Sequence, residues 1–535
     1  MKKKLSILLL LALCLSLAAC GGKTGGVKTD APTPETFSAL LTKDGTAFIP
    51  LADGTSVKIN DDVRDAEISA DRQHIAVLLE DGTLYVTDPK LEKKQTICDD
   101  CVGLLSYIKD DGFFYENKSG SMCRFRFADS SSLSFKKPDA YKIARNNLSI
   151  LYAANNELWR LGAAESEPEK IAALSDGRFE RDVYLTAISD DAETCVWVTE
   201  ELDGTQKINL RDGEDVSSIG SVKYAKDRET RATFSKDQTL LFISNNESDC
   251  AWIKKSGEPV VQVKLGALPD DQRVYANGGE LSEQNAGSVR SLYFSVEADN
   301  GSNIYNISLN GDRDRVYTGV EDYIVSNDRI IFTNTDYTLF SAKLDGSAAT
   351  EEQRIATRVA DFEVTQNGKY IYFIKNGSGS DRGPDTASLY CYKIGETEPV
   401  KVADNVACFY SEYSGYGISF LLGIMYNCYS TDGASVYFFK DGEDTVPDAA
   451  FSYHGTLMSW TYGDEAPTKL SSDVRFDLFD TISSGLSGGI DPKGFWFQKY
   501  TSVDSSENIY TDLMFYNGKE ATKLASDIFT PADGD

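Results

Sequence analysis

A repeated pair of short apolar segments most constrains what this chain can fold into. In the clearest copy, a polar turn at residues 69–74 leads into an apolar segment at 75–79. An Asp-Gly turn follows at Asp81 and Gly82, and a second segment with a Leu-Tyr pair occupies 84–88. This order is typical of a β-hairpin, because Asp-Gly supplies the positive φ angles that tight turns need. One such unit cannot bury its own apolar face, so the units must stack on one another.

The spacing of the copies indicates the kind of stack. Successive apolar centres, at residues 77, 114, 151, 196, 242, 294, 331 and 373, lie 37 to 52 residues apart. Four short strands with their turns occupy about that length in a β-propeller blade. The chain has eleven Asp-Gly and six Asn-Gly pairs and no long stretch of helical periodicity, which favours hairpins over helices. We therefore expect an all-β fold, and within it a β-propeller.

The turn that opens each unit carries a family resemblance. A serine and an acid, a turn, an aromatic strand and then a Leu-Tyr pair resemble the blades of TolB-like propellers, over roughly residues 45 to 520. That family often has Asp-Gly in the turn, whereas Arg72 and Gln238 stand at the glycine position here. The resemblance implies a propeller and says little about function, because propellers host binding, scaffolding and catalysis alike.

The number of units bears on the domain organisation. Roughly five hundred residues at this spacing give about eleven or twelve units, more than the four to eight blades of a usual propeller. We expect two tandem propellers, at residues 41–275 and 285–535, with the polar stretch 270–288 between them. One seven- or eight-bladed propeller with long insertions and a series of β-sandwiches are the alternatives.

The N-terminal residues have the order of a bacterial lipoprotein signal. Lysines at 2–4 precede an apolar run at 5–19, which ends in Leu17-Ala18-Ala19-Cys20. These residues resemble the lipobox, which implies removal of 1–19 and a diacylglyceryl thioether on Cys20; a secretory signal with a chance cysteine is the alternative. Residues 20–40, rich in glycine with two prolines, are expected to be a flexible tether. We expect a chain anchored by lipid on the extracytoplasmic face of the cell membrane.

Charge and cysteine content limit the partners. The formal charge is −29, so nucleic acid is excluded as a partner, and cations, basic proteins or neutral sugars fit better. Eight cysteines follow Cys20, mostly inside apolar segments, where cysteine packs as a small hydrophobic residue. We expect free, buried thiols, with a bridge among Cys98, Cys101 and Cys123 as the favoured exception.

Candidate catalytic motifs lack the partners that they need. The stretch 485–489 matches the G-x-S-x-G of a hydrolase nucleophile elbow, which requires a later histidine, but His74 and His454 both precede it. We interpret the stretch as a loop and both histidines as structural. Cys98 and Cys101 form a C-x-x-C without a second pair, so we do not expect a zinc site.

Two weaker features concern ligands. The acidic loops 299–303 and 310–314 could hold calcium, although neither has the full EF-hand spacing. Five tyrosines lie close together in sequence and could form a ligand platform, although core packing explains most of them: Tyr410, Tyr413, Tyr416, Tyr426 and Tyr429. We predict no catalytic, cofactor or metal residue. The favoured function is a binding, scaffold or sensor module for a protein, peptide or glycan; the alternative is a carbohydrate hydrolase or lyase with paired carboxylates in a propeller funnel.

Overall fold

The computed structural model describes most residues between 37 and 530. Gaps longer than five residues fall at 175–182, 224–229, 265–279, 379–384, 412–418, 422–428, 445–451 and 478–494, and shorter gaps occur elsewhere. All regular structure in the described part is β, and all of the strand pairs there are antiparallel, as the hairpin pattern predicts. None of the described segments is a helix long and apolar enough to span a membrane.

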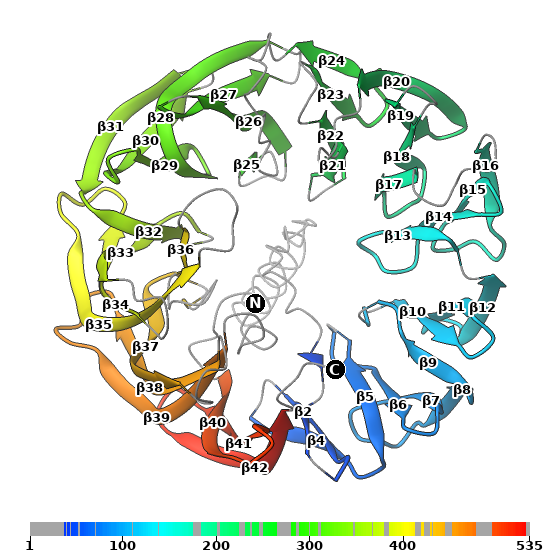
Figure 1. The fold of residues 1–535 in the computed structure, drawn as a ribbon, viewed down its shortest axis with the longest axis horizontal. Helices are drawn as coiled ribbons and strands as arrows, with labels where there is room; N and C mark the ends of the chain where they lie inside the picture. Colours follow the sequence, from blue (N-terminus) through cyan, green and yellow to red (C-terminus); the bar gives the residue numbers. More distant parts are fainter. Residues whose placement is uncertain are drawn as a thin grey trace, which may run out of the picture.

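The strands form four-stranded blades that follow one another around a single ring (Figure 1). Blades 1 to 5 each use consecutive strands, and β1 (Phe37–Ser38) adds to the edge of blade 1. Blade 1 contains β5 (Val63–Ile68), β6 (Ile75–Leu79), β7 (Leu84–Thr87) and β8 (Gln95–Cys98). Blade 2 contains β9 (Cys101–Leu104), β10 (Gly112–Asn117), β11 (Ser121–Arg126) and β12 (Ser131–Lys136). Blades 3 to 5 contain β13 (Ala140–Ile143), β14 (Ile150–Ala154), β15 (Glu157–Leu161), β16 (Glu169–Ala173); β17 (Val183–Ile188), β18 (Thr194–Glu200), β19 (Thr205–Asp212), β20 (Asp215–Lys223); and β21 (Thr230–Phe234), β22 (Leu240–Asn245), β23 (Cys250–Lys255), β24 (Val261–Lys264).

In the second half of the chain, long strands pass from one blade into the next. β28 (Arg313–Ser326) pairs with β27 of blade 6 and with β29 of blade 7, and β35 (Val400–Ser411) likewise joins blades 8 and 9. Blades 6 and 7 contain β25 (Glu280–Gln284), β26 (Ser288–Ala298), β27 (Gly301–Ser308), β28, β29 (Arg329–Asn334), β30 (Leu339–Asp345) and β31 (Ala348–Ala356). Blades 8 to 10 contain β32 (Val359–Val364), β33 (Tyr370–Ser378), β34 (Asp385–Lys393), β35, β36 (Ser419–Leu421), β37 (Ser435–Asp444), β38 (Ser452–Thr461), β39 (Thr468–Asp477), β40 (Phe495–Val503), β41 (Ile509–Tyr516) and β42 (Ala521–Thr530).

The two ends of the described chain meet in blade 11. This blade takes β2 (Leu40–Leu41), β3 (Ala47–Pro50) and β4 (Ser56–Ile59) from the start of the chain, and the bridge between Thr42 and Ile528 joins them to β42. The indole of Trp496 also donates a 3.0 Å hydrogen bond to the carbonyl of Leu51. The ring is therefore closed by strands from both ends.

The predicted all-β propeller is confirmed, and the number of rings is a separate finding. Two tandem propellers would each close on themselves, whereas blades 1 to 11 lie in one ring (Figure 1). That ring also has more blades than the alternative of seven or eight, and no insertion is needed to explain the length. The bounds expected for the two halves, residues 275 and 285, lie outside the described residues.

The turn that opens each unit has a recurring hydrogen-bond pattern. The hydroxyl of Ser69 donates to Asp71 at 2.6 Å and accepts from the backbone N–H of His74 at 3.0 Å. The same pattern recurs at Ser189, Thr365 and Ser430, all buried. These short side chains satisfy backbone groups that the turn leaves unpaired, which is why serine, threonine and aspartate occur there.

These turns also connect neighbouring blades. The carboxylate of Asp190 accepts a 2.7 Å hydrogen bond from the backbone N–H of Asn146, and its own N–H donates to the Gln238 side chain at 2.7 Å. Between blades 8 and 9, the side-chain amide of Asn367 likewise donates to the carbonyl of Asp432 at 2.6 Å. In these blades, residues of the opening turn therefore hold one turn to the next.

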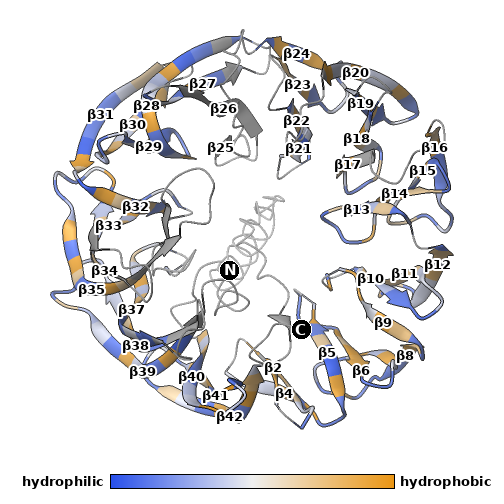
Figure 2. Ribbon diagram, viewed as in Figure 1, coloured by the Kyte–Doolittle hydropathy of each residue, from blue (hydrophilic) through white to orange (hydrophobic). Residues whose placement is uncertain are grey.

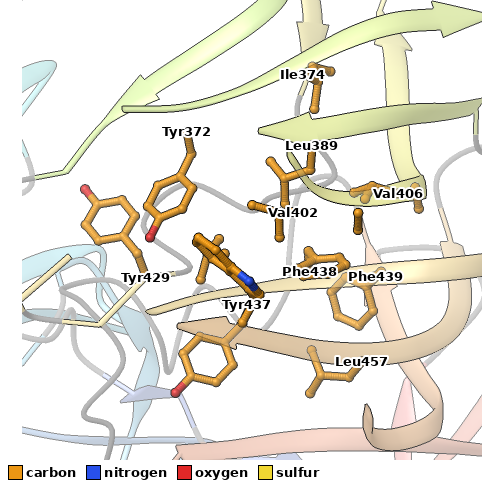
Figure 3. Packing of buried hydrophobic residues seen from close by; sticks show 14 of the residues in the cluster. Tyr372, Ile374, Leu389, Val402, Val406, Tyr429, Tyr437, Phe438, Phe439 and Leu457 are labelled. Atoms are coloured by element: carbon orange, nitrogen blue, oxygen red, sulfur yellow. The ribbon is translucent and has the colours of Figure 1, made fainter. Parts of the chain in front are cut away.

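The apolar core consists of clusters between successive blades. Figure 3 shows one such cluster, in which Tyr372 of β33 lies near Tyr429 and buried residues of β34, β35, β37, β38 and β40 complete the packing. The Tyr372 hydroxyl donates to the carbonyl of Gly433 at 2.8 Å. In contrast, outer strands such as β31 and β39 are mainly hydrophilic (Figure 2). Each blade therefore buries both faces against its neighbours and exposes its outer edge.

A buried arginine joins blades 2 and 3. Arg124 of β11 is 2% exposed, and its guanidinium donates to the carbonyls of Leu148, Gly162 and Glu165 at 3.1, 2.8 and 2.5 Å. Burial lowers its pKa to about 10. Because three carbonyls depend on one cation, its removal would leave all of them without this donor.

Candidate functional site

A pocket lies where blade 1 meets blade 2. Its volume is about 670 Å³, and its walls come from residues 72–74, from within 86–95 and from within 125–130. These segments are the opening turn of blade 1, the connection from β7 to β8, and the end of β11 with the turn that follows it. The volume lies within the range of sites that bury small molecules. We call it the blade 1–2 pocket.

A stacked pair of rings forms part of the pocket wall. The imidazole of His74 lies 4.0 Å from the ring of Phe127, centroid to centroid, with only 6° between the planes. Phe127 in turn packs edge-on against Phe125 at 5.6 Å. The backbone N–H of His74 is held by Ser69, so the opening turn of the blade fixes the position of this histidine. The structural role that the sequence predicts for His74 agrees with this hydrogen bond, and His74 also lines the pocket.

The connection from β7 to β8 has a defined shape. Asp88 accepts hydrogen bonds from the N–H groups of Leu91 and Glu92, through its carbonyl and its carboxylate, both at 2.9 Å. Leu91 has a positive φ of 59° and its side chain is 41% exposed. The ring of Pro89 restricts the φ angle of that residue, which limits the loop further. The carboxylate of Asp88 therefore shapes the loop that carries the lysines of the pocket.

The lining is rich in cationic side chains. Arg72, Lys90 and Lys93 line the pocket together with the carboxylates of Asp88 and Glu92. Arg72 stacks over the ring of Trp496, 5.9 Å from its centroid. The basic segment 90–94 was not singled out in the sequence, although three lysines in five residues are unusual in a chain with a charge of −29.

The largest upward pKa shift among the described carboxyl groups lies elsewhere, at Glu67 in β5. This side chain is 7% exposed and accepts a 3.0 Å hydrogen bond from the N–H of Ile108. Burial raises the pKa of Glu67 to about 7, and repulsion from Asp65 adds to the shift. Glu67 does not line the blade 1–2 pocket, so a carboxyl suited to general acid chemistry is not placed there.

The other histidine and the cysteines have structural surroundings. His454 stacks on Tyr500 with centroids 4.5 Å apart. The Cys98 thiol donates to Asp100 at 2.9 Å, and Cys98, Cys101 and Cys123 are free, so the favoured exception of a bridge among them is not formed. Burial raises the pKa of Cys101, Cys195 and Cys391 to about 12. Within the described residues, no cluster of three histidine, cysteine or acidic side chains could hold a metal.

Several sequence candidates fall wholly or partly outside the described residues. These are Cys20 with its lipobox and tether, the stretch 485–489, parts of both acidic loops, and the side chains of Tyr410, Tyr413, Tyr416 and Tyr426. Tyr429 is described and is only 3% exposed, which agrees with core packing for this member of the cluster.

Comparison with known proteins adds no family. No protein-family model and no curated protein matches the chain. Among solved structures it is similar to the tricorn protease, at 10% identity and a TM-score of 0.28, over 92% of this chain and 58% of that one. It is also similar to a eukaryotic initiation factor (9%, TM-score 0.39, 83% of this chain and 98% of that one) and to dipeptidyl peptidase 4 of Porphyromonas gingivalis (9%, TM-score 0.35, 78% and 66%). These scores are low, and the fold assignment rests on the sheet topology.

Proposed function

We propose that this chain is a lipid-anchored binding module of the bacterial cell envelope. The blade 1–2 pocket, with cationic and aromatic walls on a closed ring of blades, is the observation that carries the binding role. The lipobox resemblance at Leu17-Ala18-Ala19-Cys20 supports the anchor and the extracytoplasmic location. The partners we expect are the membrane, through the lipid, and a protein, peptide or glycan ligand; nucleic acid is disfavoured by the charge of −29.

A carbohydrate hydrolase or lyase is the second function that the sequence left open. Such an enzyme would need two carboxyl groups facing each other across the substrate. The lining of the blade 1–2 pocket holds two carboxylates, Asp88 and Glu92, and one oxygen of Asp88 accepts a 2.9 Å hydrogen bond from the N–H of Glu92, which gives Asp88 a structural use. The geometry therefore favours binding over catalysis at this site.

The anchor is tested by cell fractionation of two cysteine variants. Cys20→Ala should move the protein from the membrane to the soluble fraction with its circular dichroism unchanged, because the lipid is its only proposed attachment. Cys14→Ala, the matched control inside the apolar run, should stay in the membrane. A Cys20→Ala protein that has lost residues 1–19 and still remains membrane-bound would contradict the anchor.

The binding role is tested by crosslinking in intact cells that express the anchored chain. A ligand or partner should be recovered with the wild-type protein and lost with a Lys90→Glu, Lys93→Glu variant. Recovery of no partner above background, or equal recovery with both proteins, would count against a binding role for the pocket.

A further inference from the structure

Two lysines of the blade 1–2 pocket have no protein partner among the residues that the structure describes. Within the described residues, neither Lys90 nor Lys93 takes part in a hydrogen bond or an ion pair. By contrast, the next residue, Lys94, forms a 3.9 Å ion pair with Asp61 and lies over the ring of Tyr85. The carboxylate of Asp88 is occupied by the backbone of its own loop. Two cations are therefore available at the pocket, on a loop whose shape is already fixed.

The pocket also has flat and hydrogen-bonding walls. The stacked rings of His74 and Phe127 both line the pocket, and no protein group within the described part of the chain bonds the ring nitrogens of His74. Gln73, Thr87 and Gln95 add amide and hydroxyl groups to the lining. An aromatic surface beside several donors and acceptors suits a sugar ring, whose faces are apolar and whose edges carry hydroxyls.

Charge and size limit the ligand further. The chain as a whole carries −29, so a long polyanion would meet repulsion over most of the surface. At physiological salt, charges more than about 8 Å apart are largely screened, so a small anion in the pocket would respond mainly to the lining itself, in which the cations Arg72, Lys90 and Lys93 outnumber the carboxylates of Asp88 and Glu92. A volume of about 670 Å³ suits a ligand of one or two sugar rings.

We propose that the blade 1–2 pocket binds a small acidic sugar, a mono- or disaccharide that carries a carboxylate or a phosphate. Its anionic group lies between Lys90 and Lys93, and its ring lies against His74 and Phe127. This proposal rests on the binding role above and adds the class of ligand to it.

The sequence offers a direct readout, because the chain has only two histidines. The mature chain with Cys20→Ala, labelled on histidine, is titrated with galacturonate, with galactose 6-phosphate, with neutral galactose and with inorganic phosphate, while the two imidazole signals are followed by NMR. Both acidic sugars should shift the His74 signal in a saturable manner, and the His454 signal should not move. Galactose and phosphate should each bind at least about tenfold more weakly, since each lacks half of the contacts.

Matched variants complete the test. Lys90→Ala with Lys93→Ala should weaken galacturonate binding about tenfold or more, because charge-assisted hydrogen bonds are lost. Lys469→Ala with Lys519→Ala, an exposed pair outside the pocket, should leave the affinity unchanged. Three results would overturn the proposal: no saturable shift of His74 with either acidic sugar, equal binding of galactose or phosphate, or equal losses in the two double variants. Because this test uses soluble protein and defined sugars, its failure would leave the anchor and the crosslinking results untouched.

Discussion

Glu67 gives the sharpest quantitative prediction, because one carboxyl is both buried and hydrogen-bonded between blades 1 and 2. Its carboxylate accepts from the N–H of Ile108, and Gln can keep that acceptor oxygen while it removes the charge. In Glu67→Gln the cost of a buried negative charge therefore disappears and the hydrogen bond remains.

The size and sign follow from the pKa. The pKa of Glu67 rises from its ordinary 4.5 to about 7 in the folded protein. Below pH 4.5 both the folded and the unfolded chain hold this proton, and between 4.5 and 7 only the folded chain does. Stability from this group is thus lost as the pH rises through that window. Each pKa unit corresponds to about 1.4 kcal/mol, so the charge costs at most about 3 kcal/mol above pH 7.

The assay is hydrogen exchange of the peptides that cover β5 and residues 101–109, measured from pH 4.5 to 8.5 and corrected for the intrinsic rate. At pH 8, the free energy of opening of these peptides should be about 1 to 3 kcal/mol higher in Glu67→Gln than in the wild type. At pH 4.5 the two proteins should differ little. Glu80→Gln, the same change at an exposed carboxylate, is the matched control and should not protect these peptides. Equal effects of Glu67→Gln at both pH values would show that the substitution does not act by removing a buried negative charge.

Three further predictions concern the same blades and the core. Arg124→Met should lower the free energy of unfolding, measured in urea, by about 2 to 4 kcal/mol, since three carbonyls lose their donor. Arg126→Met, two residues further along β11 at a half-buried position, should lower it by about 1 kcal/mol or less. The Cys195 thiol, with its pKa raised to about 12 by burial, should resist iodoacetamide at pH 8 until the protein unfolds. Labelling of Cys195 itself in the native protein, located by peptide mapping, would contradict this burial. Gly112→Ala should be more destabilising than Gly120→Ala in thermal unfolding, because a Cβ at Gly112 would meet a backbone carbonyl at 2.1 Å while Gly120 faces open space.

The fold could be predicted from the sequence because its signals are local. The hairpin at Asp81 and Gly82 forms as expected, with Gly82 at a φ of 92°. Arg72 and Gln238, which depart from the family's Asp-Gly, still take positive φ angles of 59° and 57°. The buried serine and the acid side chain hold the turn in that shape, so glycine is not required there.

The arrangement of blades could not be predicted in the same way. A strand such as β28, whose 14 residues serve two blades, has no sequence signal for the point where one blade ends. Ring closure depends on the pairing of Thr42 with Ile528, which lie at opposite ends of the chain. Hydrophobic periodicity reports the face of a strand and not its distant partner.

The pocket was missed for a related reason. His74 and the basic segment 90–94 belong to blade 1, whereas Phe127 belongs to blade 2, and only the packing of the two blades brings them together. The lysines were the one available signal, because they stand out against the acidic composition.

The most direct test of the account is a crystal structure of the mature chain grown with galacturonate. We expect one closed ring with the sugar in the blade 1–2 pocket, its carboxylate within hydrogen-bond distance of Lys90 or Lys93 and its ring against His74. An ordered galacturonate at another site, with this pocket free of sugar, would contradict it.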